Sequence, residues 1–307
     1  MSPVSSDDIA GKIKSQAACL GFDACGFAAA DPVDDEDVER YDRWLAQGKH
    51  GCMSWAGNHR DLRRDPSLLL DGAKTVISLA MNYYPARFQP DGALRVAYYA
   101  YGRDYHEVLR ERMACLAQFI EQTTGCRTRP CVDSAPMRER YWAQRAGVGF
   151  VGLNNCLIIP GKGSFFFLGE IVTTAQLPPD TPCTMTCSGC SRCVEACPSG
   201  ALNGDGAADC TRCLSCLLIE DHSPMLPEWV AHVQGDRVVG CDACQLCCPH
   251  NKVAVATAID DFTPTAAVLA LTRESIARMT AGEFRRAFSH SAIARVRYKT
   301  LKRNSGL

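Results

Sequence analysis

The sequence predicts an α/β (α+β) domain, a small cysteine-rich module and a short helical C-terminal extension, and two observations lead to this fold class. Over the first 180 residues, amphipathic helical segments alternate with short apolar runs rich in β-branched residues. Twelve cysteines then follow between Cys183 and Cys248, in a stretch with few large hydrophobic residues. Because such a stretch cannot bury a conventional core, we expect bound metal to hold it together.

The elements of the first domain follow from local patterns. Apolar residues recur at helical spacing in three segments, and the acidic residues that begin the first segment suit the positive end of a helix dipole. Four apolar runs have the length and composition of strands. Helices are therefore expected at 7–20, 34–47 and 104–122, and strands at 75–81, 129–133, 156–159 and 164–173.

The domain boundaries follow from changes in composition. LPPDTP at 177–182 indicates a linker, so we expect the α/β domain at 1–180, the cysteine-rich module at 181–255 and the helical extension at 256–307. From Phe284 to the end there are seven basic residues and no acidic one, although the whole chain has a formal net charge of −1. The extension is thus a cationic patch on an acidic body.

The cellular location follows from what the sequence lacks. Residues 1–16 have no apolar core of a signal peptide, and no window approaches the roughly 18 apolar residues of a membrane-spanning helix. We therefore expect a soluble, cytoplasmic protein that does not bind membranes. Since the cytosol keeps thiols reduced, the nineteen cysteines indicate metal binding rather than disulfides.

The first cysteine array has the spacing of bacterial ferredoxins. Cys187, Cys190 and Cys193 are separated by two residues each, and Cys197 follows after three more, directly before Pro198. In that pattern, the first three thiolates hold one [4Fe-4S] cube and the cysteine before proline binds the other cube. The sequence therefore predicts a ferredoxin-like module with two clusters, close enough together to pass electrons to a second redox centre.

The second array supplies the reciprocal ligand. Cys248 precedes Pro249, so it is assigned to the first cluster together with Cys187, Cys190 and Cys193. The second cluster is expected to bind Cys197, Cys241, Cys244 and a fourth cysteine. Cys247 continues the regular spacing, whereas Cys213 comes from the segment between the arrays; spacing alone favours Cys247 slightly.

Two other interpretations of the cysteines stay open. Structural zinc also uses sites of four cysteines, although the cysteine–proline ends of both arrays favour iron–sulfur clusters. A third cluster on Cys210, Cys213 and Cys216 is the weaker alternative. The scattered cysteines have no ligand spacing, and each is interpreted as a buried, inert thiol. These are Cys19, Cys25, Cys52, Cys115, Cys126, Cys131, Cys156 and Cys183.

A family resemblance extends over nearly the whole chain. Besides the two cysteine arrays, it rests on a series of short motifs in a fixed order. These are Trp44-Leu45, Gly51-Cys52-Met53, Arg63-x-Asp65-Pro66, AMNYYP at 80–85, YGRDYH at 101–106, VDSAP at 132–136, GSFxxLGEI at 163–171 and Arg303-Asn304. In this combination the sequence resembles the epoxyqueuosine reductase family.

The resemblance implies a cofactor, a substrate and a ligand. Cobalamin would lie between the N-terminal domain and the ferredoxin-like module, and the clusters would reduce its cobalt. The substrate would be the epoxide of epoxyqueuosine in a tRNA anticodon loop, and the product queuosine. The family pattern also implies Cys213, rather than Cys247, as the fourth ligand of the second cluster. Candidate cobalamin contacts are Asn58, Tyr98, Leu157, Ser164, Ser215 and Asp242.

The resemblance implies a catalytic role for Asp133, which matches the family's acid. Opening an epoxide creates an alkoxide, and a carboxylic acid can protonate it if burial raises the pKa of that acid toward neutrality. Without the family, Asp133 before Ser134-Ala135-Pro136 is more simply a helix N-cap or turn residue. Arg103, Tyr105 and His106 are candidates for the same pocket, or are packing and capping residues.

The partners follow from charge and from the resemblance. The basic residues after Phe284 suit the phosphates of tRNA, and Tyr298 among them could stack on a base. An external donor of the flavodoxin or ferredoxin type would supply electrons to a monomeric enzyme. Two alternatives stay open: a corrinoid reductase acting on a small molecule such as an organohalide, and an electron carrier without a catalytic site. The basic tail argues against the first, and the long N-terminal domain against the second.

Overall fold

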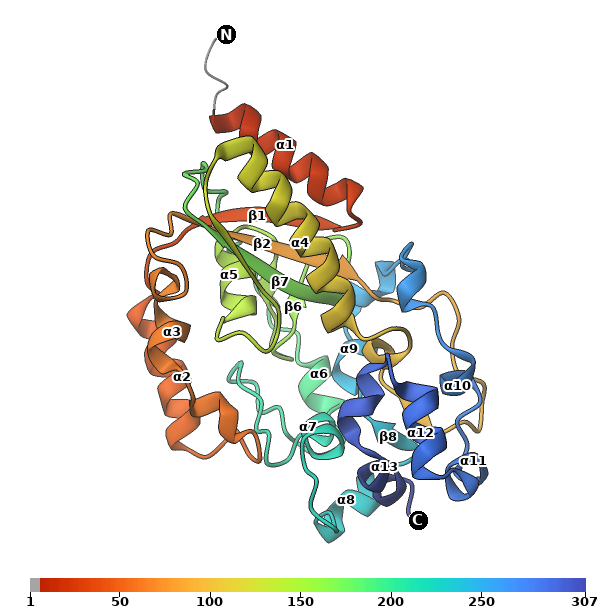
Figure 1. The fold of residues 1–307 in the computed structure, drawn as a ribbon. Helices are drawn as coiled ribbons and strands as arrows, with labels where there is room; N and C mark the ends of the chain where they lie inside the picture. Colours follow the sequence, from red (N-terminus) through yellow and green to blue (C-terminus); the bar gives the residue numbers. More distant parts are fainter. Residues whose placement is uncertain (1–5) are drawn as a thin grey trace.

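The computed structural model describes residues 6–307 and is built around one antiparallel sheet (Figure 1). Its four strands lie in the order β1 (Ala24–Ala29), β2 (Thr75–Asn82), β7 (Phe166–Thr173) and β4 (Thr128–Cys131). Neighbouring strands all run antiparallel. This arrangement confirms the expected mixture of helices and strands and defines it as α+β.

One face of the sheet is covered by the two longest helices. Alternate residues of β2, among them Ile77 and Leu79, pack against α1 (Ser6–Cys19) and α4 (Tyr105–Thr124) in the largest core cluster. Both helices follow the apolar pattern at 7–20 and 104–122, to within two residues at each end. Asp104 caps α4, since its carboxylate accepts a hydrogen bond from the His106 N–H.

The other face of the sheet packs on α5 (Glu139–Arg145). Val76 and Ala80, which alternate with the residues above, contact Trp142 in a second core cluster. With both faces covered, β2 is buried along almost its whole length, which explains the unbroken apolar run at 75–81.

The remaining elements are short. The strand expected at 156–159 is only β6 (Leu157–Ile158), paired with β5 (Phe150–Val151). The helix expected at 34–47 is α2. The other bounds in the N-terminal part are α2 (Asp35–Ala46), α3 (Arg60–Arg64), β3 (Arg95–Val96) and 3-10 turns at Ser54–Gly57, Pro66–Leu68 and Tyr98–Ala100.

The cysteine-rich region contains little regular structure, as its composition predicts. The linker at 177–182 forms no helix or strand, but Asp180 ties it to the first domain through an ion pair with Lys14 at 2.6 Å and a hydrogen bond from the Phe27 N–H at 2.9 Å. The elements that follow are α6 (Arg192–Glu195), α7 (Leu214–Ile219), α8 (Glu228–Val233), β8 (Arg237–Val239), α9 (Ala243–Leu246) and a 3-10 turn at Pro249–Val253.

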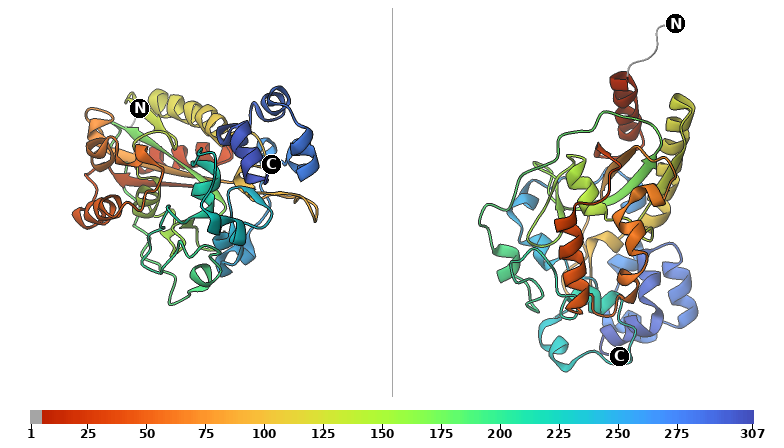
Figure 2. Two further views of the ribbon diagram at one scale, coloured as in Figure 1. Left: turned by 90° about the horizontal axis from the view of Figure 1, so that it is seen from below. Right: turned by 90° about the vertical axis from the view of Figure 1, so that its left-hand side faces the viewer.

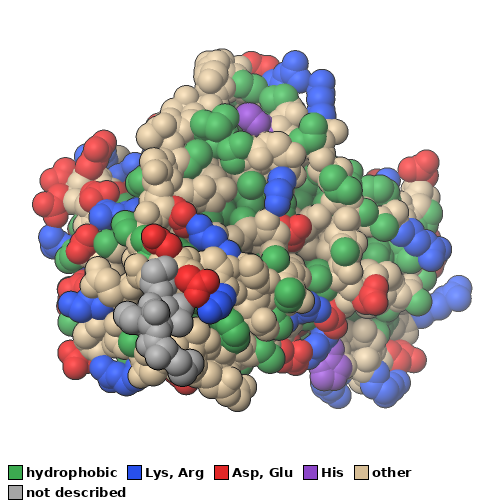
Figure 3. Space-filling view, turned by 90° about the horizontal axis from the view of Figure 1, so that it is seen from above, with side chains coloured by type: hydrophobic (Ala, Val, Ile, Leu, Met, Phe, Trp, Pro, Cys, Tyr) green, Lys and Arg blue, Asp and Glu red, His purple; other side chains and the backbone are tan. Residues whose placement is uncertain are grey.

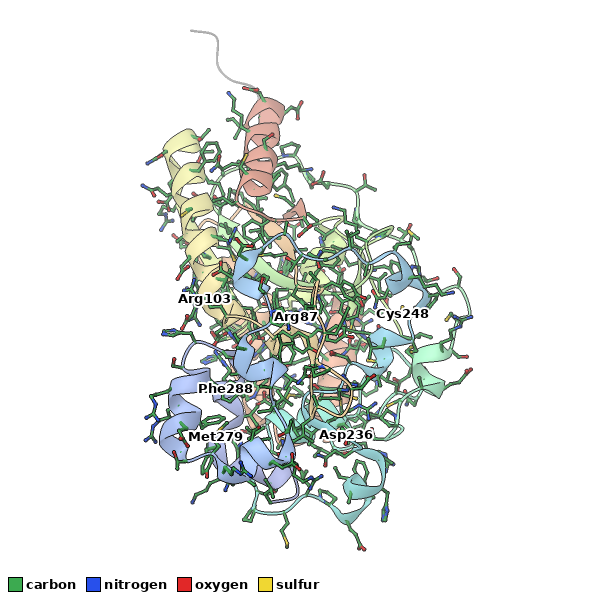
Figure 4. The ribbon with its side chains drawn as sticks, turned by 90° about the vertical axis from the view of Figure 1, so that its right-hand side faces the viewer. Arg87, Arg103, Asp236, Cys248, Met279 and Phe288 are labelled. Atoms are coloured by element: carbon green, nitrogen blue, oxygen red, sulfur yellow. The ribbon has the colours of Figure 1, made fainter. Side chains whose placement is uncertain are left out.

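The C-terminal region is a set of short helices that lie beside the module, far from α2 and α3 (Figure 2). Its core includes Phe288, together with Val96 from the N-terminal part and Val239 from the module (Figure 4). The three expected domains therefore share hydrophobic contacts. The bounds are α10 (Ala266–Leu269), α11 (Arg273–Arg278), α12 (Ala281–Phe288), α13 (Tyr298–Asn304) and 3-10 turns at Asp260–Phe262 and Ala292–Val296.

The surface at the end that carries α1 and α4 has mixed charge. Figure 3 shows acidic and basic side chains interspersed on this face. Over residues 6–307, none of the helices combines the length and the apolar character needed to cross a membrane.

The last helix is held by Asn304, and this contact gives a stability prediction. The buried Asn304 amide donates to the carbonyls of Leu218 and Val238, both at 2.8 Å. The substitution Asn304→Ala leaves two carbonyls without a partner, so we expect the free energy of unfolding to fall by about 2 kcal/mol. The measurement is the thermal midpoint at a fixed scan rate. Lys299→Ala, an exposed change in the same helix, is the control and should shift the midpoint little. An unchanged midpoint in the first variant would contradict the anchoring role.

Candidate active site and metal centres

Four predicted ligands surround one cavity in the cysteine-rich module. Cys187, Cys190 and Cys193 line it with Cys248, which arrives from the second array just before Pro249. This is the grouping that the reciprocal pattern predicts. Among residues 6–307, no three histidine, cysteine or acidic side chains meet closely enough to hold a single metal ion. The four thiols enclose a space instead of converging on a point (Figure 4 labels Cys248).

The first domain contacts this group of thiols directly. The Leu153 N–H donates to Cys187 Sγ at 3.3 Å. Phe150 and Ile158, from the small β5–β6 hairpin, pack against Cys248. A backbone N–H donated to a ligand sulfur stabilises the negative charge that a cluster places there. The hairpin is therefore part of the environment of the first site.

The other predicted ligands form a second group. Burial, followed by the nearby thiols of Cys210 and Cys241, raises the pKa of Cys213 to about 12. Burial also raises the pKa of Cys241, which lies close to Cys244, and Cys197 lies close to Cys244 in turn. Cys213 is thus a neighbour of the second array. The Cys213 and Cys241 thiols therefore keep their protons without metal, so iron binding must displace those protons. Burial would also raise the pKa of Cys197, but hydrogen bonds from nearby groups outweigh it and lower that pKa.

Cys247, the alternative ligand, has neighbours in both arrays. Burial and then the nearby Cys244 and Cys190 thiols raise its pKa. It does not line the cavity described above. Cys210 and Cys216 interact with each other through their thiols, and Cys216 Sγ also lies 3.4 Å from Met53 Sδ.

The scattered cysteines only partly follow the expectation of buried thiols. Cys131 is buried, and burial raises its pKa and that of Cys25 to about 12, which suits inert thiols. Cys19, Cys52 and Cys115 are exposed, so the expectation was wrong for these three. Two of them lie on the outer sides of α1 and α4, where the helical pattern allows any small residue.

Asp133 lies just after β4, in the loop that leads to α5. Its backbone has φ = 37°, a left-handed conformation that is costly for a residue with a side chain. Its N–H donates to Glu139 Oε1 at 2.7 Å, which holds the backbone in place. The side chain is 46% exposed, and one carboxylate oxygen lies 2.7 Å from His106 Nε2. Asp133 is therefore not a helix N-cap but a turn residue, as the alternative interpretation of the sequence allows, and its carboxylate lies at the surface of the loop.

His106 stands between two carboxylates. Its Nδ1 lies 2.7 Å from Asp104 Oδ1, and its Nε2 lies 2.7 Å from Asp133 Oδ2. The ring is only 2% exposed and packs on Tyr105, which in turn stacks on Phe167. Of the residues proposed for the pocket, His106 thus contacts the candidate acid. Arg103 instead pairs with acidic residues around the start of α4.

The protonation of this triad differs from the expectation. Burial would raise the pKa of Asp133, but the hydrogen bond and positive charge of His106 outweigh it, so the pKa is lowered. Burial lowers the pKa of His106, yet the hydrogen bonds to Asp104 and Asp133 raise it above the ordinary value of 6.5. The condition that burial raises the pKa of Asp133 toward neutrality is therefore not met in the free protein, because the histidine partner lowers that pKa.

Two further carboxylates lie behind the loop. Burial, and then the charge of Asp133, raises the pKa of Glu139 to about 7. Glu170, on β7, is fully buried, and burial next to Glu139 raises its pKa strongly. Its nearest hydrogen-bonding partner is Ser78 Oγ at 3.4 Å, and its second oxygen has no partner among the described residues. Glu170 is thus held in its neutral form.

The candidate cobalamin contacts are only partly brought together. Asp242 accepts a hydrogen bond from the Tyr98 N–H at 2.7 Å and joins the module to the N-terminal part. Burial raises the pKa of Asp242 to about 6. Ser164 is buried at the same junction, where its carbonyl accepts a hydrogen bond from Gln245 Nε2 at 2.9 Å.

The other three candidates come from other elements of the chain. Ser215 is partly exposed in α7, directly after the ligand candidate Cys213. Leu157 is buried in the core cluster beneath α5, so its side chain faces protein. Asn58 is exposed near α3, and its carbonyl accepts from Arg63.

The basic residues of the C-terminal region do not all face solvent. Arg303 is largely buried, where it pairs with Asp221 and donates to the carbonyls of Ser223 and Leu217. Arg295 lies beside the group formed by Asp104, His106 and Asp133, with its Nε 3.8 Å from Asp104 Oδ2. Tyr298, proposed to stack on a base, donates its hydroxyl to the Met279 carbonyl. Exposed basic residues remain at Arg285, Arg286, Arg297 and Lys299.

Comparison with known proteins identifies the family. Residues 63–134 match the family model described as epoxyqueuosine reductase QueG, DUF1730, and residues 186–251 match the 4Fe-4S double cluster binding domain. An epoxyqueuosine reductase of Gloeobacter violaceus is 42% identical over 96% of this chain and 94% of its own length. The chain belongs to the epoxyqueuosine reductase family. The relative from Cellulophaga algicola is 37% identical, over 95% of each chain.

Solved structures agree with this assignment. A crystal structure of epoxyqueuosine reductase with a tRNA-Tyr epoxyqueuosine-modified stem loop has a TM-score of 0.89 and 29% identity, covering 98% of this chain and 80% of that one. The Bacillus subtilis enzyme has the same TM-score and identity, covers 98% and 81%, and is described with an aspartate catalytic loop swung out of the active site. Residues 186–251 thus form a domain for two iron–sulfur clusters.

Several residues of the site were not predicted. The local sequence around two of them, Glu139 and Gln245, does not indicate a function, because a single acidic or amide residue in a helix is usually solvated. Glu170 does stand in the apolar run at 164–173, and a carboxylate inside a buried strand is a detectable exception.

The fourth ligand of the second cluster can be tested by iron content. Because Cys213 neighbours Cys241, we expect Cys213→Ser to lower the iron of anaerobically reconstituted protein from about eight to about four atoms per chain. Cys247→Ser should keep about eight. Cys126→Ser, which changes a cysteine outside the module, is the control. The opposite result for the first two variants would assign Cys247 instead.

Proposed function

We propose that this protein reduces epoxyqueuosine to queuosine in the anticodon loop of tRNA. The observation that carries the proposal is the similarity over nearly the full length to epoxyqueuosine reductases, at 42% identity for one relative. A solved relative with 29% identity holds an epoxyqueuosine-modified stem loop, which supports the same substrate here. The half-exposed Asp133 next to a buried histidine supplies the proton chemistry that opening an epoxide requires.

The clusters would be held by eight cysteines from the two arrays. Cys187, Cys190, Cys193 and Cys248 would bind one [4Fe-4S] cluster around the shared cavity, and Cys197, Cys213, Cys241 and Cys244 the other. The N–H of Leu153 would donate to the first cluster through Cys187. An external flavodoxin or ferredoxin type donor would supply the electrons.

Cobalamin would lie at the junction of the first domain and the module, and the residues there suit its chemistry. The corrin edge carries amides, which need uncharged donors and acceptors. Burial raises the pKa of the Tyr98 hydroxyl to about 12, so it stays a neutral hydrogen-bonding group. Two partly exposed residues add further groups: Ser215 adds a second hydroxyl, and Asp242 adds a hydrogen-bond acceptor. When bound, cobalamin supplies a cobalt centre that accepts electrons from the clusters for transfer to carbon. Asn58, Leu157 and Ser164 remain candidate contacts.

The partner surface would be the C-terminal region. The exposed Arg285, Arg286 and Lys299 lie on α12 and α13, where they would contact tRNA phosphates. Arg303 is excluded from this role because it is turned inward. We propose that the protein acts as a monomer in the cytoplasm, where tRNA is modified.

Replacement of the candidate acid tests the proposed function. Anaerobically reconstituted protein should convert epoxyqueuosine in tRNA to queuosine, and Asp133→Asn should slow conversion by about 10²–10⁴-fold, since the amide cannot deliver the proton. The measurement is nucleoside analysis of the digested tRNA. Asp236→Asn, at an exposed loop, is the matched control and should keep the wild-type rate. Reconstituted wild-type protein that leaves epoxyqueuosine unchanged would reject the substrate.

The salt dependence of tRNA binding tests the basic surface. The double substitution Arg285→Ala and Lys299→Ala removes two phosphate contacts, so the slope of log K against log salt should fall by about 1.4–1.8. Affinities are measured with an anticodon stem loop at several salt concentrations. Lys12→Ala with Arg43→Ala removes two exposed charges elsewhere and should leave the slope unchanged. Equal slopes for both double variants would exclude this face as the tRNA surface.

A further inference from the structure

His106 is hydrogen-bonded to two carboxylates, and a general acid at Asp133 would not require these contacts. A carboxylic acid that protonates an alkoxide requires only its own proton, yet Asp133 is bonded at 2.7 Å to an imidazole that is 2% exposed. The second ring nitrogen is held at 2.7 Å by Asp104, which is 16% exposed. A buried imidazole between two carboxylates is most stable as the imidazolium, donating to both.

The charges of the triad leave Asp133 without a proton before the substrate binds. The pKa of its carboxyl is lowered, and that of His106 is raised. Near neutral pH, the transferable proton is therefore on His106 Nε2, and Asp133 is a carboxylate that accepts its hydrogen bond. Asp133 alone could not act as the acid in this state, because its carboxylate carries no proton to donate.

We propose that His106 stores the proton that Asp133 delivers to the epoxide oxygen. The inference rests on the proposed function, since it concerns the protonation step of that reaction. Asp133 contacts the substrate and is the catalytic residue. His106 acts through Asp133 and is a positioning and proton-storing residue.

Substrate binding provides the trigger for proton transfer. The Asp133 side chain is 46% exposed, and a substrate base seated against it would remove that water. Desolvation disfavours an ion pair relative to the neutral pair, so the proton moves along the 2.7 Å hydrogen bond from Nε2 to the carboxylate. Asp133 is then a neutral acid at the moment when the epoxide oxygen is next to it.

The stoichiometry fits this sequence of transfers. Epoxide reduction consumes two electrons and two protons, breaks both C–O bonds and forms one C=C bond and one water. The electrons come from the external donor through the iron–sulfur clusters. The first proton goes from His106 through Asp133 to the oxygen as the first C–O bond breaks. For the second proton, a solvent proton recharges His106, which passes it through Asp133 to the departing hydroxyl, and a further solvent proton restores the imidazolium.

The remaining charges around the triad set how firmly the proton is held. Asp104 fixes the ring so that Nε2 points to Asp133, and its charge favours the imidazolium. Arg295, 3.8 Å from Asp104, opposes the charge on His106. The titratable and charged groups outside the triad that act on it include Glu139, Arg295, Tyr99 and Tyr105.

Replacement of His106 by glutamine distinguishes storage of the proton from positioning of the Asp133 carboxylate. In His106→Gln, the side-chain amide can still donate to Asp133 but carries no transferable proton. We expect the rate of conversion at pH 7.5 to fall at least 10-fold, and to rise about tenfold per pH unit on acidification, because Asp133 must then take its proton from water. The wild-type rate should fall only as the pH rises through the raised pKa of His106, above which the store is empty. His232→Gln, an exposed histidine on α8, is the matched control.

A second variant tests the proton on His106 while keeping the histidine. Asp104→Asn keeps the helix cap but removes the charge that favours the imidazolium. The alkaline limb of the rate should move to lower pH by about one unit or more. A variant of His106→Gln with the wild-type rate and pH profile, or an unmoved limb in Asp104→Asn, would overturn the proposal.

A readout independent of turnover completes the test. NMR titration of the His106 ring in the complete protein should give a pKa above 6.5 that falls in Asp133→Asn, because the partner charge is lost. An unchanged titration would overturn the proposal even if the enzyme is active. Conversely, wild-type protein that fails to convert epoxyqueuosine but shows the shifted titration would reject the substrate and leave the paired proton store intact.

Discussion

The whole structure depends on cysteine thiols from two distant stretches of chain meeting around shared sites. Between Cys183 and Cys248 the chain forms only short helices and one short strand, and its largest apolar cluster there is built on Leu214, Leu217 and Leu218. Such a cluster is too small to fold the module alone. Because Cys248 lines the same cavity as Cys187, metal binding and the closure of a loop of about sixty residues are one event.

This dependence explains why the other parts of the chain wrap the module. The N-terminal part contributes the Leu153 N–H to one ligand sulfur and the Tyr98 N–H to the carboxylate of Asp242, which follows another ligand. The last helix contributes Asn304, which satisfies carbonyls of the module. Electron transfer between domains needs fixed distances between the redox centres. The polar contacts at the junctions fix the relative positions of the domains better than apolar packing alone, because each hydrogen bond requires a defined geometry.

Features that depend on neighbouring residues in the sequence were predicted. Features that depend on contacts between distant parts of the chain were not. The buried strand at 75–81, the helix at 104–122 and the first group of ligands follow from period and spacing, which are local properties. For the fourth ligand of the second cluster, spacing alone favours Cys247 and the family pattern favours Cys213. Nothing in the local sequence shows that Cys213 lies near Cys241. The protonation of Asp133 could not be predicted, since its partner His106 lies 27 residues away and reverses the effect of burial.

The loop that carries Asp133 is held by Glu139, whose pKa of about 7 lies close to neutral pH. Asp133 adopts a costly left-handed backbone, and the bond from its N–H to Glu139 offsets that cost. Glu139 has a pKa of about 7 and lies beside the neutral Glu170, so its charge responds to any change in the charge of Asp133. When the proton moves from His106 to Asp133, Glu139 loses the repulsion of Asp133, which is the larger effect, and the weaker attraction of His106. The pKa of Glu139 therefore falls, and the hydrogen bond that holds the loop becomes stronger. In the proposed reaction, the loop would therefore be held most firmly when Asp133 carries the proton.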